Sequence, residues 1–88
     1  MQNPKIAKKV ARIEELIAQS RAANAIIDES FAGLESWVRS AARAGLDRVV
    51  IPQIAKLYRS LGKDLGLPKT ASTTAIRASL LENGYTRN

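Results

Sequence analysis

The residues of this 88-residue chain that are best suited to chemistry are lysines, arginines and hydroxyl residues between positions 48 and 77. Lysine and arginine can neutralise phosphates along a nucleic-acid backbone, and each such contact releases counterions. Hydroxyls at a helix N-terminus can also hold phosphates, and an arginine one turn further along can reach a guanine edge. We therefore predict phosphate contacts from Arg48, Lys56, Arg59, Lys63 and Lys69, and positions near the bases for Thr73, Thr74 and Arg77.

Catalytic chemistry has little support in the sequence. The chain contains no Cys and no His, so zinc sites, Ser-His-Asp triads and Cys-His dyads cannot be assembled. Ser60 and Lys63 match the S-x-x-K spacing of serine acyl-transfer enzymes, but the companion S-D-N and K-T-G motifs are absent. We expect no enzymatic activity, no cofactor, no metal and no small-molecule substrate.

The charge balance favours a polyanionic partner. Fourteen Lys and Arg against eight Asp and Glu give a formal net charge of +6, and nucleic acid is the commonest partner of such a protein. Residues 45–88 hold seven basic and three acidic side chains, whereas residues 1–44 hold seven and five. The C-terminal half is therefore expected to be the better surface for a polyanion.

The sequence also gives an expectation for where the protein resides. It has no run of about 18 apolar residues that could span a bilayer. Its first residues, "MQNPKIAKKV", lack the apolar region of a signal peptide. We expect a cytoplasmic protein without a membrane partner.

Residues 4–45 are predicted to be helical, because they are rich in Ala, Glu, Lys, Arg and Leu and contain no proline after Pro4. Alternate steps of four and three from Ile6 give a heptad seam in which only Ser20 and Asn24 are polar. Such a seam predicts a partner helix, and a buried asparagine favours two strands. We expect a homodimer, parallel or antiparallel, through Val10, Ile13, Ile17, Asn24, Ile27, Phe31, Leu34 and Val38.

Two interpretations of this region remain open. The heptad phase passes through Ser30 without a slip, as one long helix requires. Alternatively, Asp28 and Ser30 can cap a new helix and Gly33 weakens the first one, so that the chain breaks near 28–33 and folds back as a hairpin. Trp37, off the seam, is expected to pack against the C-terminal region.

Gly45 is typical of a helix end and Asp47 of a following cap, which divides the chain into a helical dimerisation region, 1–45, and a DNA-binding region, 46–88. In the second region, a helix with Pro52 in its first turn is followed by a turn. A last helix begins near Ser72 and ends at Asn83-Gly84, where Tyr85 can close a Schellman motif.

The stretch "GLPKTASTTAIRASLLENGY", preceded by a helix, resembles the helix-turn-helix proteins of bacterial, plasmid and phage regulators over about residues 50–85. The segment "PKTAS" makes the turn longer than in that family. The resemblance implies double-stranded DNA as the partner, and paired half-sites for a dimer.

These observations predict an all-α protein with a long N-terminal heptad helix and a small C-terminal unit of helix-turn-helix type. The function expected is that of a small, basic, dimeric DNA-binding protein, either a transcriptional regulator or a DNA-organising accessory protein. The alternative is a helical protein–protein interaction module, an adaptor or inhibitor, that lays its seam or its basic face on an acidic protein partner.

Overall fold

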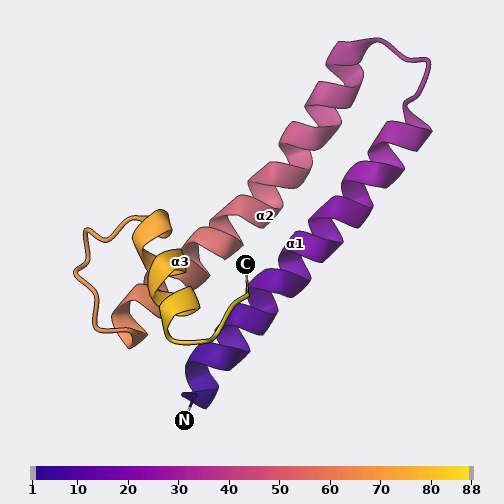
Figure 1. The fold of residues 1–88 in the computed structure, drawn as a ribbon. Coiled ribbons are helices and arrows are strands. Elements are labelled where there is room, and N and C mark those ends of the chain that lie inside the picture. Colours follow the sequence, from indigo (N-terminus) through magenta and orange to yellow (C-terminus); the bar gives the residue numbers. More distant parts are fainter. Residues whose placement is uncertain (1, 88) are drawn as a thin grey trace.

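The computed structural model describes residues 2–87, which form three helices and no strand (Figure 1). These are α1 (Pro4–Ser30), α2 (Ser36–Asp64) and α3 (Thr73–Glu82). Helices α1 and α2 run antiparallel as a hairpin, and α3 lies at its open end, beside the start of α1 and the end of α2 (Figure 1). The molecule measures 50 × 24 × 19 Å. The predicted all-α fold is confirmed.

None of the helices within residues 2–87 is both long enough and apolar enough to cross a membrane.

Of the two interpretations of the N-terminal region, the structure has the hairpin. Helix α1 ends at Ser30, the Phe31 amide donates to the Ile27 carbonyl at 3.0 Å, and α2 begins at Ser36. Gly33 has φ +86°, a left-handed conformation that glycine adopts without the steric penalty of a Cβ. The weak point predicted near 28–33 is therefore where the chain reverses.

Helix α2 continues through two residues that were expected to stop or begin a helix. The prediction that Gly45 ends a helix is wrong, because α2 is continuous from Ser36 to Asp64. Pro52 lies inside it and has no N–H to give to the Arg48 carbonyl. At the next residue, the Gln53 side-chain amide donates to the Val49 carbonyl at 2.9 Å. Packing along α1 outweighs these local signals.

The boundaries of α3 agree with the sequence. The Ser72 hydroxyl accepts from the Ala75 amide at 3.1 Å, which caps the first turn. At the other end Gly84 has φ +79°, and the Tyr85 amide donates to the Leu80 carbonyl at 2.9 Å. This long bond is the signature of the Schellman motif. The predicted stop is confirmed.

The apolar core lies at the open end of the hairpin, where all three helices meet. Leu61 from α2 is 0% exposed and Leu80 from α3 is 2% exposed. Gly62 permits the close approach of α3 to α2, because a Cβ there would lie 3.3 Å from the Ile76 side chain. The cluster consists of Ile6, Val10, Ile13, Tyr58, Leu61, Ile76 and Leu80.

The residues before α1 and after α3 are tied together over this core. The Asn3 backbone N–H donates to the Tyr85 hydroxyl, and the Gln2 side-chain amide donates to the Gly84 carbonyl, each at 2.6 Å. These bonds join residues 82 positions apart in the sequence. They hold α3 against the start of α1.

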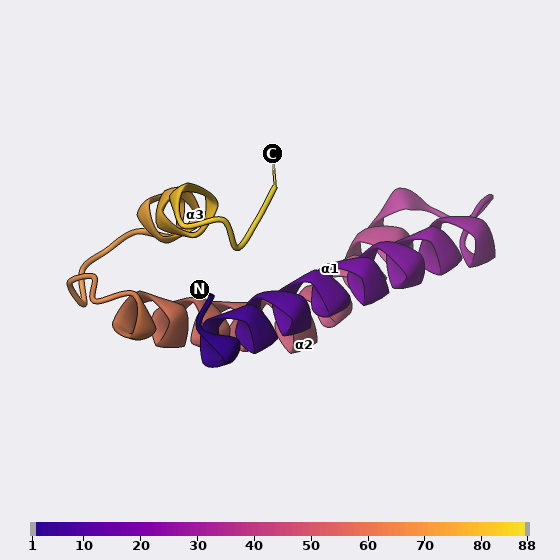
Figure 2. The same cartoon turned by 60° about the horizontal axis from the view of Figure 1, so that its bottom comes forward.

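We call residues 2–19 and 53–87 the head, and residues 20–52 the arm. Helix α3 covers one face of the α1–α2 layer in the head only, and the arm extends beyond it as a layer of two helices (Figure 2). In the arm, only Val50, at its base, is buried. The hairpin is therefore well packed at one end and thinly covered at the other.

The heptad seam is used within the chain. Val10 and Ile13 are buried in the head core, and Ile17 packs against it. The remaining members line the arm interior or its tip: Asn24, Ile27, Phe31 and Val38 are half-buried, and Leu34 is 52% exposed. A second copy would therefore have to use a different surface.

Trp37 lies at the start of α2, at the far end of the arm, and is 66% exposed. The prediction that it packs against the C-terminal region is wrong, because the hairpin places it opposite α3. Its indole N–H donates to the Glu35 carboxylate at 2.6 Å.

Candidate nucleic-acid interface

The net charge of the protein resides in the head. Its two segments, 2–19 and 53–87, hold ten Lys and Arg and four Asp and Glu, a net charge of +6. The arm, 20–52, holds four of each, a net charge of zero. The hairpin thus brings the basic start of α1 beside the basic end of α2, which a comparison of the two halves of the sequence did not predict.

A basic stripe runs along α2. Lys56, Arg59 and Lys63 are all exposed, and at about 100° per residue they fall within an arc of about 60°. This arc is roughly opposite Leu61, the fully buried residue of the helix. Arg48 is also exposed, on the same side, and lies about 12 Å before Lys56 at 1.5 Å per residue, within the arm.

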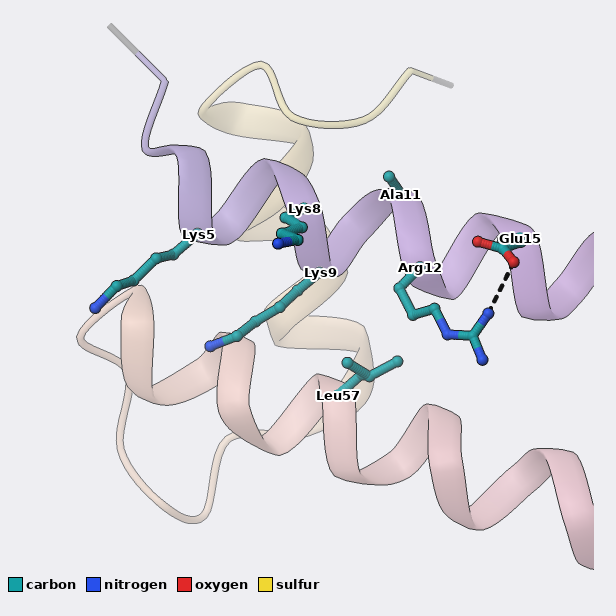
Figure 3. Close-up of a pocket in the computed structure, with 7 residues that line it drawn as sticks. All are labelled: Lys5, Lys8, Lys9, Ala11, Arg12, Glu15 and Leu57. Atoms are coloured by element: carbon teal, nitrogen blue, oxygen red, sulfur yellow. Dashed lines mark hydrogen bonds and ion pairs between the residues drawn. The ribbon is translucent and has the colours of Figure 1, made fainter.

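On one side of this stripe, a shallow groove opens between α1 and α2, on the face turned away from α3 (Figure 3). Lys9 is ion-paired with Asp64, and Arg12 with Glu15 at 2.9 Å. Lys5 and Lys8 form no ion pair with residues 2–87. We call this the α1 groove; its lining is Lys5, Lys8, Lys9, Ala11, Arg12, Glu15 and Leu57.

On the other side of the stripe, a second groove lies between α2, the connection 65–72 and α3. Arg59, Lys63 and Lys69 line it, so the structure brings together three of the five residues predicted to contact phosphates. The connection leaves α2 through a second Schellman bond, from the Leu67 amide to the Gly62 carbonyl at 2.9 Å. Its apolar lining includes Leu67, Pro68 and Ile76.

The residues predicted to lie near the bases are on α3. Thr73 and Thr74 are exposed in its first turn. Arg77 is held against α2, because its Nε donates to the Tyr58 hydroxyl at 3.1 Å and its guanidinium carbon lies 5.5 Å from the ring centroid. Its terminal nitrogens make no hydrogen bond within residues 2–87 and remain donors for an external group.

The connection between α2 and α3 differs from that of a helix-turn-helix motif. Residues 65–72 separate Asp64 from Thr73, whereas the motif has a turn of about 3–4 residues. The order of elements matches the motif but the docking of its second helix cannot be transferred from it. No group of three or more His, Cys, Asp or Glu within residues 2–87 is placed to hold a metal ion.

Comparisons with protein-family models, curated proteins and solved structures found no match to this chain. The head's charge and its two grooves are therefore the basis for assigning a function.

Proposed function

We propose that this protein binds double-stranded DNA as a homodimer and serves in transcription regulation or DNA organisation in the cytoplasm. The observation that carries this proposal is the uneven distribution of charge. The head has a net charge of +6, and the arm has a net charge of zero. A duplex presents about one phosphate charge per 1.7 Å of its axis, and a concentrated basic surface gains affinity by releasing the counterions.

The basic side chains form a band that suits the duplex backbone. The α2 stripe of Lys56, Arg59 and Lys63 lies between the α1 groove and the groove that contains Lys69. In our proposal these residues contact phosphates, with Lys5 joining them from α1 and Arg48 from the base of the arm. Thr73, Thr74 and Arg77 are then the side chains nearest the bases.

Single-stranded nucleic acid is a poorer partner because the head offers no stacking platform. Proteins that bind single strands stack the bases on exposed aromatic side chains. In the head, Tyr58 is 9% exposed and belongs to the core, and Tyr85 is half-buried against it. Trp37 and Phe31 lie in the arm, away from the basic band.

Fluorescence anisotropy with a labelled random-sequence duplex, titrated with salt, tests the proposal. If six cations of the band contact phosphates, log K falls against log salt with a slope of about −5. A flat or unmeasurable binding curve at the lowest salt concentration contradicts DNA binding.

One observation favours a second candidate function. In the α1 groove the apolar side chain of Leu57 lies between those of Lys9 and Arg12 (Figure 3). An amphipathic helix with acidic flanks, from a protein partner, fits an apolar floor with a basic rim. Failure to bind duplex DNA, together with binding of an acidic amphipathic peptide that is lost in Arg12→Glu, would favour this interaction module.

A further inference from the structure

The groove between α2, the connection 65–72 and α3, which we call the α3 groove, has an apolar lining that phosphate contacts do not use. Its volume is about 510 Å³, within the range of about 300–1,000 Å³ that small-molecule sites occupy. The side chains of Leu67, Pro68, Ala71 and Ile76 line it. Phosphates gain nothing from such side chains, so DNA binding leaves this part of the groove without a role.

The backbone fixes the shape of the α3 groove. At the start of the connection, the Leu67 amide donates to the Gly62 carbonyl at 2.9 Å. Near its end, the Ala71 amide donates to the Pro68 carbonyl, also at 2.9 Å. Gly62 and Ile76, the buried residues of the lining, lie so close that a Cβ on Gly62 would be 3.3 Å from Ile76 Cδ1. The groove is therefore formed before a ligand arrives, as small-molecule sites usually are.

The charged side chains of the α3 groove are all cations. They are Arg59, Lys63 and Lys69, and no Asp or Glu within residues 2–87 lines the groove. None of the three cations forms an ion pair with another residue of the range 2–87. An anion among them is therefore attracted without competition from a carboxylate of the lining.

The lining also decides which anion fits. Among residues 2–87, the only polar side chains that line the groove are the three cations, so no hydroxyl or amide side chain is available to bind a sugar or the edge of a base. The described part of the chain also places no aromatic side chain there for a ring to stack on. The complementary ligand is an aliphatic body with one anionic group.

We propose that the α3 groove binds a small aliphatic carboxylate of the fatty-acid type, and that this ligand releases DNA. The aliphatic chain lies on the apolar lining and the carboxylate lies among Arg59, Lys63 and Lys69. Because the same three residues contact phosphates in the proposed function, the ligand and the duplex compete for them. Release of DNA therefore rests on the proposed function, whereas binding of the carboxylate does not.

Binding is tested without DNA, by titrating the whole chain with octanoate and following the amide NMR signals. The signals of Leu67, Ala71 and Ile76 should shift and saturate. Butanoate has the same head group on a shorter chain, and octanol has the chain without the charge. Each should bind at least about tenfold more weakly than octanoate. No saturable shift with octanoate, or equal binding of butanoate or octanol, would overturn the inference.

Two lysines of the α2 stripe give a matched pair of variants. Lys56 and Lys63 are both exposed, but only Lys63 lines the α3 groove. Lys63→Gln should weaken octanoate binding about threefold to fivefold, and Lys56→Gln should leave it unchanged. Both variants should weaken DNA binding to a similar extent, and circular dichroism shows that the helices are intact. Equal effects of the two variants on octanoate binding would overturn the assignment of the ligand to this groove.

Release of DNA is tested by the anisotropy titration with octanoate at constant ionic strength. At 0.1 M salt, saturating octanoate should weaken binding of the random duplex by about eightfold, because neutralising one cation removes one phosphate contact. Octanol should have no effect. A DNA affinity that octanoate leaves unchanged would overturn the competition. A protein that binds DNA but not octanoate would overturn this inference alone, whereas one that binds octanoate but not DNA would contradict the proposed function and support the carboxylate site.

Discussion

The most informative prediction compares the same substitution in the head and in the arm. Arg59→Gln removes one charge from the middle of the α2 stripe, and Arg21→Gln removes one from the arm. Both arginines are exposed within long helices and form no ion pair within residues 2–87. The two variants therefore have the same net charge and the same change in side chain.

The expected difference follows from where each charge lies. Losing one phosphate contact should reduce the salt slope by about 0.9 and, at 0.1 M salt, weaken DNA binding by about eightfold. That factor corresponds to about 1.2 kcal/mol. Arg21 lies about 13 Å along α1 from Arg12, the last basic residue of the head on that helix. This exceeds the Debye length of about 10 Å at 0.1 M salt, so Arg21→Gln should bind DNA nearly as the wild type does.

The assay is the anisotropy titration with a random duplex, carried out on both variants at several salt concentrations. Circular dichroism establishes that the helices are intact in each. Equal losses in the two variants would mean that only total charge matters, and the assignment of the head as the DNA-binding surface would be refuted. A larger loss for Arg21→Gln would place the contact surface on the arm.

Three further predictions concern the packing of the head and the helices that carry it. Leu61→Ala should lower the free energy of unfolding by about 2–5 kcal/mol in urea titrations, because Leu61 is fully buried; a loss much smaller than this range would contradict the described core. Gly66→Ala should destabilise the protein by about 1–2 kcal/mol, since φ is +73° there. Gly45→Ala, in an open helical position, should stabilise it by about 0.5–1 kcal/mol. Melting temperatures that shift in the same direction in both variants would contradict this pair of predictions. Tyr58→Phe keeps the ring but removes the acceptor for Arg77, and should destabilise by about 0.5–1.5 kcal/mol with a measurable change in Arg77 Nε exchange by NMR.

The sequence was sufficient where short-range signals decide the structure. The start of α3 at Ser72 and its end at Gly84 and Tyr85 depend on hydrogen bonds between residues three to five positions apart. A hydroxyl before a helical run and a glycine after it predict those bonds without knowledge of the rest of the chain. For the break near Gly33, the local signals supported only one of the two interpretations that the sequence left open.

Local signals failed where contacts along the whole hairpin decide. Gly45 favours a helix end and Pro52 a helix start, yet α2 passes through both because residues before and after them pack on α1. Trp37 was expected beside the C-terminal region, but the reversal at 31–35 carries it to the other end of the molecule. Neither result could be derived without knowing that α1 and α2 pair along their length.

The same pairing limits what could be predicted of the candidate site. The residues of the α2 stripe were found from their spacing, because a single helix positions them. The contribution of Lys5, Lys8 and Arg12 required knowing that α1 returns to the end of α2. The bond between Arg77 and Tyr58, residues 19 apart, likewise depends on how α3 crosses α2.

Pro52 has a mechanical consequence for the molecule. It stands where the arm meets the head, and the backbone bond it cannot make leaves α2 with lower bending stiffness at this point than elsewhere. Thermal bending should therefore concentrate at the base of the arm, with the head moving as one rigid piece. Bending at this joint would change the direction of the arm, while the α2 stripe and the two grooves of the head keep their geometry.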